Sequence, residues 1–243
     1  HNSDMLLNEH TALVTSQILL CPYSEHHVPT YHEWMKDEEL QELTASEPLS
    51  LSEEYDMQRS WRQDSDKLTF IACLPPSSPA DSNTTITPKQ DDAPSRMIGD
   101  INLFLVDDDD DEDEPNTSAP RSVLGEIELM IAVKSQHRKG HGRASLLAFM
   151  HYILTNTSSI LQEYSKSQAV HLRYLRVKIS KDNVKSIALF ESVGFLRTSA
   201  EANYFGELEL RLQVQGREDT VLTDLEKVKG WNGTPSVVDY REA

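Results

Sequence analysis

Residues 125–150 read GEIELMIAVKSQHRKGHGRASLLAFM, and this stretch decides how the chain folds. It begins as an apolar strand over residues 126–133, continues through a loop with Gly140 and Gly142 among basic residues, and ends as an apolar helix. A glycine loop between a strand and a helix N-terminus directs backbone N–H groups and the positive end of the helix dipole toward one point. The stretch therefore predicts a binding site for a phosphate group.

The strand over residues 126–133 has two different faces, because side chains alternate along a strand. One face carries only apolar side chains, those of Ile127, Leu129, Ile131 and Val133. The other face carries Glu126 and Glu128. Two carboxylates therefore share one side of a strand that we expect to be central in a sheet.

Composition limits the function. The net charge of −17 argues against general nucleic-acid binding, which needs basic clusters, and fits a cationic or amine-bearing substrate. Two cysteines give no disulfide framework and are expected to be small core residues in a reducing compartment. No apolar run is long enough to span a membrane. We expect a cytoplasmic protein without nucleic-acid or membrane partners.

The chain is expected to form a single α/β domain over residues 5–215. Capping residues and hydrophobic periodicity predict helices over 24–35, 37–43, 52–63, 142–164 and 183–193, and strands over 16–23, 68–74, 97–106, 126–133, 172–180 and 208–214. Two segments, about 75–95 and 107–121, are expected to be flexible insertions, the second with eight consecutive acids in a solvated hairpin loop. Residues 216–243 are expected to form an irregular tail.

Three segments carry a resemblance to a known family. The loop before Gly140 and Gly142 is similar to the pyrophosphate motif Q/R-x-x-G-x-G/A, and residues 178–195, KISKDNVKSIALFESVGF, are similar to the motif Asn-x-x-Ser/Ala followed by Gly-Phe. Residues 21–35, CPYSEHHVPTYHEWM, with 40–48, LQELTASEP, resemble the N-terminal signature of N-acetyltransferase 9-like proteins. The chain thus resembles the GCN5-related N-acetyltransferase (GNAT) superfamily, in its N-acetyltransferase 9-like branch.

The resemblance implies a mixed twisted sheet of about six to seven strands flanked by helices, with acetyl-CoA in a splayed cleft between strand 126–133 and strand 175–180. Pantetheine would pair with the strand that contains Met130, Ile131 and Val133, and an N–H near Leu129 or Met130 would stabilise the oxyanion. The remaining residues expected to bind the cofactor are Arg138, Lys139, Gly140, His141, Gly142, Arg143, Asn183, Ser186 and Phe190.

The same resemblance implies direct attack by an amine in a ternary complex, which needs a base. Glu126 and Glu128 are the candidates, and Glu128 is favoured because it is nearer the expected oxyanion amide. Alternatively, either glutamate pairs with a neighbouring lysine or faces a solvated loop.

Two positions depart from the family pattern. Arg138 stands where many relatives have glycine, and Phe190 replaces a tyrosine that serves many relatives as general acid. Coenzyme A would then leave as a thiolate, or be protonated by water or by another residue such as Tyr204. Residues 44–48 are a candidate substrate loop.

We expect a protein amine as acceptor, with tubulin or microtubules as possible partners suggested by relatives. The alternative is a catalytically weak module that binds acetyl-CoA or the cytoskeleton. No metal site is expected, since His26, His27 and His32 have no set of ligand partners and suit solvated or capping roles.

Overall fold

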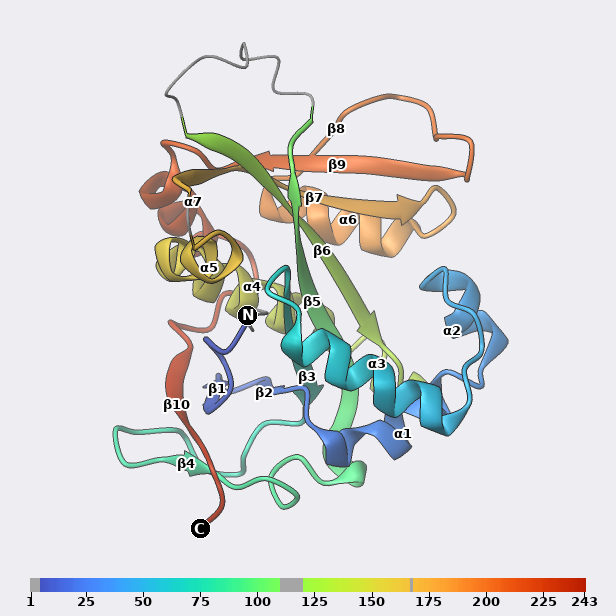
Figure 1. Ribbon diagram of the computed structural model, residues 1–243, viewed down its shortest axis with the longest axis vertical. Coiled ribbons are helices and arrows are strands. Elements are labelled where there is room, and N and C mark those ends of the chain that lie inside the picture. Colours follow the sequence, from blue (N-terminus) through green and yellow to red (C-terminus); the bar gives the residue numbers. More distant parts are fainter. Residues whose placement is uncertain (1–4, 110–119, 167) are drawn as a thin grey trace.

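The computed structural model describes residues 5–109, 120–166 and 168–243. One mixed sheet has the strand order β4-β10-β1-β2-β3-β5-β6-β7-β9-β8 (Figure 1). Its described strands are β1 Thr11–Val14, β2 Leu19–Pro22, β3 Lys67–Cys73, β4 Thr85–Ile86, β5 Met97–Asp107, β6 Arg121–Ile131, β7 Val170–Ser180, β8 Leu196–Arg197, β9 Glu207–Gln213 and β10 Ser236–Tyr240. The sheet is therefore larger than the six or seven strands expected from the sequence.

Helices connect and cover these strands. The α-helices are α1 Val28–Trp34, α2 Glu38–Leu43, α3 Leu51–Gln63, α4 His141–Thr155, α5 Thr157–Tyr164, α6 Val184–Val193 and α7 Glu218–Leu225, and the short 3-10 helices are η1 Glu25–His27, η2 Pro94–Arg96 and η3 Lys134–Gln136. None of the helices within the described ranges combines the length and apolar character that a membrane span requires.

Local hydrogen bonds set the helix ends. Helix α3 begins one residue earlier than expected, because Ser50 and Glu53 form a capping box at its start. The single helix expected over 142–164 is two helices, α4 and α5. Between them the Asn156 side chain donates to Tyr152 O (2.9 Å), and the Thr157 hydroxyl donates to Ile153 O (2.8 Å). Such side-chain bonds compete with the helical backbone pattern and break the helix there.

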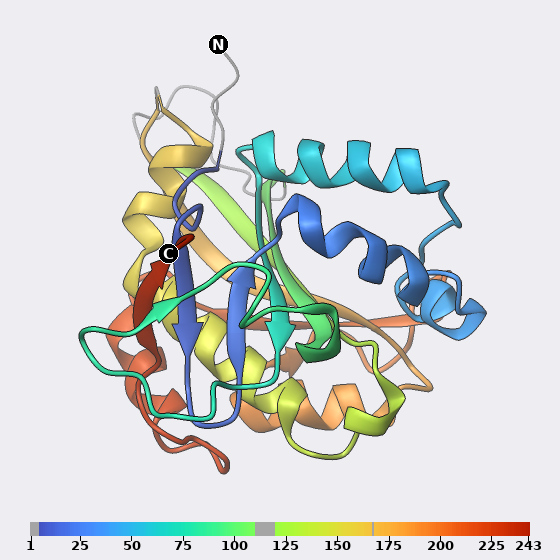
Figure 2. The same cartoon turned by 90° about the horizontal axis from the view of Figure 1, so that it is seen from below.

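Hydrophobic side chains form two clusters, one on each face of the sheet, and Figure 2 shows the helices that cover these faces. Helices α4, α5, α6 and α7 contribute to the cluster on one face, and the blue helices α1 and α2 contribute to the cluster on the other. Residues of β6 divide between them, because Ile127 belongs to the first cluster and Met130 to the second. This division confirms the alternation expected along β6. Both cysteines are buried and reduced.

The expectation of an irregular tail over residues 216–243 is wrong. This segment contains α7 and β10, and β10 pairs with β1 over four residue pairs and also with β4. Strand β4 in turn belongs to the segment 75–95, which was expected to be a flexible insertion and which buries Ile86 and Asp92. Both segments complete the sheet beside the first strand, a long-range pairing that local sequence patterns do not reveal.

The second expected insertion lies mostly outside the described residues, which omit 110–119 and with them the acids from residue 110 to residue 114. Its first acids are described and are not simply solvated. Asp107 accepts a hydrogen bond from Tyr164 (2.7 Å), and buried Asp108 pairs with Arg173 (2.8 Å). These contacts attach the end of β5 to α5 and β7.

Candidate active site

Strands β6 and β7 are paired over only part of their length. Their parallel ladder runs from Arg121 opposite Val170 to Glu126 opposite Arg176 and then ends. Beyond that point β6 stays paired with β5, while β7 stays paired with β9. Residues 127–131 of β6 and 177–180 of β7 therefore diverge; we call this opening the splay (Figure 1).

The splay exposes peptide groups along one edge of β6. In an antiparallel ladder alternate residues direct their N–H and C=O groups to the same neighbour. Ala132 donates its N–H to Ile98 O of β5 (2.7 Å). The alternation therefore directs the peptide groups of Leu129 and Ile131 to the opposite edge of β6, toward β7. The carbonyl of Ile131 accepts a hydrogen bond from His137 Nε2 (2.6 Å). Hydrogen-bonding groups of β6 thus line the splay.

The glycine loop leads into the start of α4. Arg138 and Gly140 both have positive φ, 64° and 83°. Helix α4 has no side-chain cap at its N-terminus and no acidic residue in its first turn. A Cβ at Gly142 would meet only side-chain carbons at 3.8–3.9 Å, so packing within the protein does not by itself require glycine there. Uncapped N–H groups, a positive helix end and an open glycine surface fit a bound phosphate.

The basic side chains of this loop are not equivalent. Arg138 and Lys139 are exposed and free to approach an anion. Arg143 instead donates to Ser192 Oγ (2.8 Å) on α6 and to Lys229 O (3.2 Å) near the C-terminus. His141 donates to Gln136 Oε1 (3.1 Å), and burial lowers its pKa. The side chains of Arg143 and His141 are therefore engaged with the protein.

The second predicted motif builds the start of α6. Asn183 caps this helix, because its side-chain oxygen accepts from the Ser186 N–H (3.3 Å). Phe190 is buried and packs edge-to-face on Phe195, with the ring centroids 5.1 Å apart. These contacts give Asn183 and Phe190 structural roles, and any contact they make with a cofactor stays a prediction.

Glu126 and Glu128 lie on one face, as predicted, but have different surroundings. Glu126 accepts a hydrogen bond from Arg176 Nε (2.8 Å) at the last pair of the ladder, and Lys178 Nζ is 3.9 Å away. This is the ion-paired alternative foreseen from the sequence, with arginine as the main partner. Glu128 lies two residues further, where β7 has diverged.

Among the described residues Glu128 has no hydrogen-bond or ion-pair partner. Its side chain reaches the splay, but reduced solvation against the sheet raises its pKa to about 7, with further contributions from the carboxylates of Glu126, Asp100 and Glu207. A carboxylate with this pKa can exchange a proton near neutral pH.

Asp100 of β5 was not recognised from the sequence. It is 4% exposed, accepts a hydrogen bond from Asn102 Nδ2 (3.2 Å), and also accepts one from Tyr31. Burial raises its pKa to about 7, against the effect of these two hydrogen bonds. The signal was an acid two residues before Asn102 within the apolar run MIGDINLFLV, which places both side chains on one strand face.

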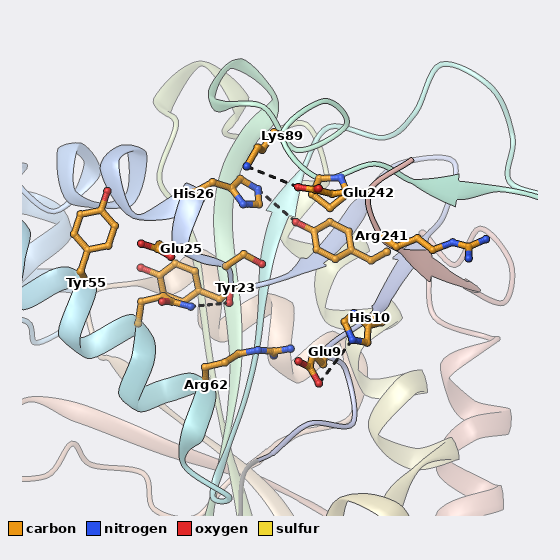
Figure 3. A pocket seen from close by; sticks show the side chains of 14 residues that line it. Glu9, His10, Tyr23, Glu25, His26, Tyr55, Arg62, Lys89, Arg241 and Glu242 are labelled. Carbon is orange, nitrogen blue, oxygen red and sulfur yellow. Dashed lines mark hydrogen bonds and ion pairs between the residues drawn. The ribbon is translucent and has the colours of Figure 1, made fainter.

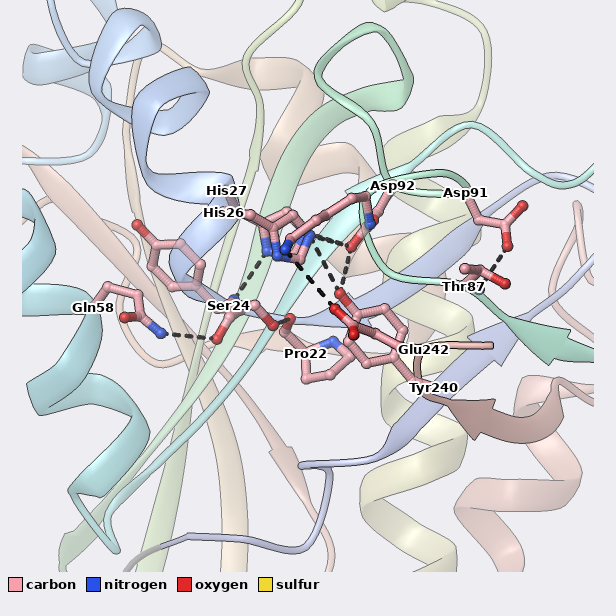
Figure 4. Close-up of polar contacts among 12 residues, drawn as sticks. Pro22, Ser24, His26, His27, Gln58, Thr87, Asp91, Asp92, Tyr240 and Glu242 are labelled. Atoms are coloured by element: carbon pink, nitrogen blue, oxygen red, sulfur yellow. Dashed lines mark hydrogen bonds and ion pairs between the residues drawn. The ribbon is translucent and has the colours of Figure 1, made fainter.

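A second polar cluster lies at the other end of the sheet (Figure 4). Asp92 Oδ2 accepts hydrogen bonds from His27 Nε2 (2.5 Å), His26 Nε2 (2.9 Å) and the Tyr240 hydroxyl (2.6 Å). Three of these residues, His26, His27 and Asp92, have the residue types of a metal site. However, His27 Nδ1 accepts the Ser24 N–H (2.9 Å), so its proton lies on Nε2.

A ligating histidine would need that nitrogen free and would donate from the other one. The cluster is therefore suited to hydrogen bonding and not to holding a metal. His27 also caps η1, as one sequence alternative proposed, although it is fully buried and not solvated.

A cavity of about 720 Å³ adjoins this cluster (Figure 3). Its charged lining mixes acids and bases, namely Glu9, Glu25, Glu242, Arg62, Lys89 and Arg241. None of the residues predicted to bind the cofactor lines it. The cavity is therefore separate from the splay.

Comparisons with known proteins agree with this geometry. A family model described as an acetyltransferase (GNAT) domain matches residues 17–196. The N-acetyltransferase 9-like protein of Schizosaccharomyces pombe is 40% identical over 221 residues, covering 86% of this chain and 98% of the relative. The alpha/beta-tubulin-N-acetyltransferase 9 of Drosophila melanogaster is 41% identical over 195 residues, covering 80% and 82%, and the human protein of that name is 40% identical over 215 residues, covering 88% of each.

Solved structures share the fold at low sequence identity. A spermidine N-acetyltransferase from Vibrio cholerae, in complex with CoA and spermine, has a TM-score of 0.53 at 15% identity and covers 84% of this chain and 99% of its own. The aminoglycoside acetyltransferase AAC(6')-Ib in complex with coenzyme A also has a TM-score of 0.53, at 17% identity, and covers 84% and 98%.

Proposed function

This chain belongs to the GNAT acetyltransferase family, in its N-acetyltransferase 9-like branch, and is an N-acetyltransferase whose acetyl donor is acetyl-CoA; from that premise we propose that it acetylates an amine of a protein and that Glu128 takes the amine proton. The observation that carries the proposal is the contrast between the two glutamates. Glu126 is held by Arg176, whereas Glu128, at the splay, has no partner within the described part of the chain and has a pKa of about 7.

Acetyl-CoA supplies an activated acetyl thioester when it is bound. The backbone N–H groups at the start of α4, with Arg138 and Lys139 beside them, would hold its pyrophosphate. The exposed peptide edge at Ile131 would pair with its pantetheine, in place of the His137 side chain that now bonds Ile131 O. No metal enters this scheme.

The acceptor amine must be neutral to attack, so the chain has to remove a proton from it. Glu128 lies on the same strand as Leu129, whose N–H is directed into the splay by the strand alternation. The proposed base and the proposed oxyanion donor are therefore neighbours along β6. The Leu129 N–H would stabilise the negative charge that develops on the carbonyl oxygen.

A protein acceptor is supported by the surface next to the splay. Tyr204 and Phe205 are 96% and 81% exposed, and their rings pack edge-to-face. The Lys181 N–H donates to Gly206 O, which fixes their loop beside the end of β7. Exposed aromatic pairs of this kind are typical of protein interaction sites. Tyr204 is thereby better placed to contact a partner than to act as the general acid considered from the sequence.

We propose α/β-tubulin as the acceptor, because relatives that are 40–41% identical carry the name alpha/beta-tubulin-N-acetyltransferase 9. Incubation of the purified chain with labelled acetyl-CoA and tubulin should transfer label to tubulin amines. Label on another protein of a cell extract, with none on tubulin, would contradict the tubulin assignment while keeping the acetyltransferase proposal. The cytoplasmic location expected from the sequence stays a prediction.

The base assignment is tested with Glu128→Gln. We expect turnover at pH 7 to fall by roughly 10²–10⁴, the usual contribution of a general base. Thermal stabilisation by coenzyme A should be retained, since the anion site is unchanged. The matched control is Glu163→Gln on α5, which should keep full turnover.

Unchanged turnover in Glu128→Gln would remove Glu128 as the base. Stabilisation by coenzyme A without acetylation of any amine would instead favour the binding-module alternative.

A further inference from the structure

A row of polar side chains runs across three strands toward the splay. Thr69 of β3 is opposite Asn102 of β5, and Asn102 is opposite Glu128 of β6. Residues opposite each other in antiparallel strands share one face of the sheet. Thr69 and Asn102 are buried, and Glu128 is the end of the row that reaches the splay. The face that carries the proposed base is therefore polar well into the interior.

Asp100 lies next to this row. It is two residues from Asn102 on the same strand face, and it is the diagonal neighbour of Glu128, a separation of about 7–8 Å in such ladders. Asn102 Nδ2 donates to its carboxyl group at 3.2 Å, and Tyr31 of α1 donates as well. No lysine, arginine or histidine forms an ion pair with Asp100 among the described residues.

Helices α1 and α3 cover this row with further polar groups. Glu54 of α3 is buried and lies 3.9 Å from His32 of α1, and the rings of Tyr23 and Tyr31 are 5.4 Å apart. Within the described ranges, buried atoms without a hydrogen-bond partner include Tyr23 Oη, His32 Nδ1, Glu54 Oε2, Thr69 Oγ1 and Asn102 Oδ1. Since buried polar atoms are normally satisfied by protein or water, this layer suits ordered water.

We propose that Asp100 is a second carboxyl group of the active site, which interacts electrostatically with Glu128 as its diagonal neighbour and so sets the pH at which Glu128 acts as a base. The proposal rests on the function proposed above. Asp100 is a positioning residue, because it acts on Glu128 and does not touch the acceptor.

The reaction gives this second carboxyl group a purpose. An ammonium acceptor must lose one proton before its nitrogen attacks and another as the C–N bond forms and the C–S bond breaks. The departing thiolate takes up one proton, and the other is released to solvent. Two interacting carboxyl groups can hold both protons in turn, and such groups titrate as a pair.

Several charged and titratable groups surround the pair. From the strands and helices packed around it they are Glu126, Arg176, Lys178, Glu207, Tyr23, Tyr31, His32 and Glu54. The test must therefore change Asp100 without altering these groups. Asp100→Asn does so, because the amide oxygen can still accept from Asn102.

The experiment follows the carboxyl groups by ¹³C NMR in the full chain labelled at aspartate and glutamate, with saturating coenzyme A. Glu128→Gln assigns the Glu128 signal. In the unmodified chain we expect Glu128 and Asp100 to titrate together near neutral pH. In Asp100→Asn we expect Glu128 to titrate alone, roughly 0.5–1.5 pH units lower, because a neighbouring negative charge has gone. The acid limb of turnover should move by the same amount.

The control is Asp108→Asn, which removes a buried aspartate just beyond the other end of β5. It should leave the Glu128 titration in place. Tyr31→Phe serves as a second variant that removes a donor to Asp100, and it should raise the pH at which Asp100 titrates.

An unchanged Glu128 titration in Asp100→Asn would overturn the inference even if Glu128 is the base. Loss of the acid limb in Asp100→Asn with unchanged turnover in Glu128→Gln would instead overturn the proposed base.

Discussion

At the scale of single residues, two glutamates on one strand face acquire different properties from the neighbouring strand. Glu126 lies at the last pair of the β6–β7 ladder and meets Arg176, while Glu128 lies where the ladder has ended. The two glutamates are only two residues apart along β6. The end of the ladder thus separates a structural carboxylate from a chemically available one.

In the Glu126–Arg176 pair, the positive charge of Arg176 is expected to reduce the effect of the Glu126 carboxylate on the pKa of Glu128. Arg176→Met should leave Glu126 without its main partner and destabilise the chain by about 1–2 kcal/mol, since both side chains are only partly exposed. The less compensated charge should raise the pKa of Glu128, so the acid limb of turnover should move to higher pH. Urea unfolding and a pH–rate profile measure the two effects.

The double variant Glu126→Gln/Arg176→Met is the control for this prediction. Removing both partners should recover part of the lost stability and return the acid limb toward its original pH. An acid limb that stays in place in Arg176→Met would show that Glu126 does not influence the base.

The sequence predicted that Glu126 and Glu128 share one face, because side chains alternate along a strand whatever its neighbouring strands are. It missed the Arg176 contact, because that depends on the register between β6 and β7. It also missed Asp100, since one acid in an apolar strand does not reveal whether a helix covers it. Tyr31 comes from a segment far away in the sequence.

At the scale of elements, the glycine loop and α4 form the best-predicted part of the molecule. The strand and the helix are each long enough to show a hydrophobic period, and the two glycines mark the loop between them. Strands β1, β4 and β10 are short and find partners far along the chain, so no local pattern identifies them. The same reason explains why the C-terminal segment was expected to be irregular.

The two glycines of this loop are expected to serve different ends. Gly142→Ala should cost little stability, because the helix tolerates alanine and its Cβ would make ordinary contacts. It should nevertheless raise the KM for acetyl-CoA, since the methyl group would fill the open surface beside the N–H groups. Gly140→Ala should destabilise the chain by about 1 kcal/mol because of its positive φ.

Melting temperatures and KM values for acetyl-CoA of both variants test this distinction. Equal KM values for Gly142→Ala and the unmodified chain would contradict a close approach of the cofactor at Gly142. Gly194→Ala is a useful comparison, because Gly194 has a positive φ of 111° but caps the C-terminal end of α6, at the opposite end of that helix from Asn183.

At the scale of the whole molecule, the C-terminal segment joins distant parts of the sheet. Strand β10 lies between β4 and β1, and its Tyr240 donates to Asp92, which also binds His26 and His27. Three segments that are far apart in sequence thus meet at one carboxylate. Nearer the active site, Arg143 of α4 reaches Lys229 O, so the same segment also supports the helix behind the glycine loop.

The buried cluster around Asp92 should make folding sensitive to acid. Burial lowers the pKa of His27 in the folded state. In the unfolded state the histidine binds a proton below its ordinary pKa of about 6.5, whereas in the folded state it stays neutral to a lower pH. The stability contributed by neutral His27 is therefore complete above that pH and is lost as the pH falls. Burial acts to raise the pKa of Asp92, but its hydrogen bonds from His26, His27 and Tyr240 hold that pKa well below its usual range.

Asp92 therefore adds stability that is lost only at much lower pH, so between pH 7.5 and 5.5 the share of the change that comes from this cluster should be that of His27, while the raised pKa values of Glu128 and Asp100 act in the opposite direction. We expect the His27 share to cost about 1 kcal/mol at pH 5.5, or roughly 2–4 °C in melting temperature. His27→Gln should melt lower at every pH but lose this part of the slope, whereas exposed His10→Gln should keep it. An equal slope in His27→Gln and the unmodified chain would mean that the histidine is protonated in the folded state, and that the link between the C-terminal strand and β2 does not depend on its neutral form.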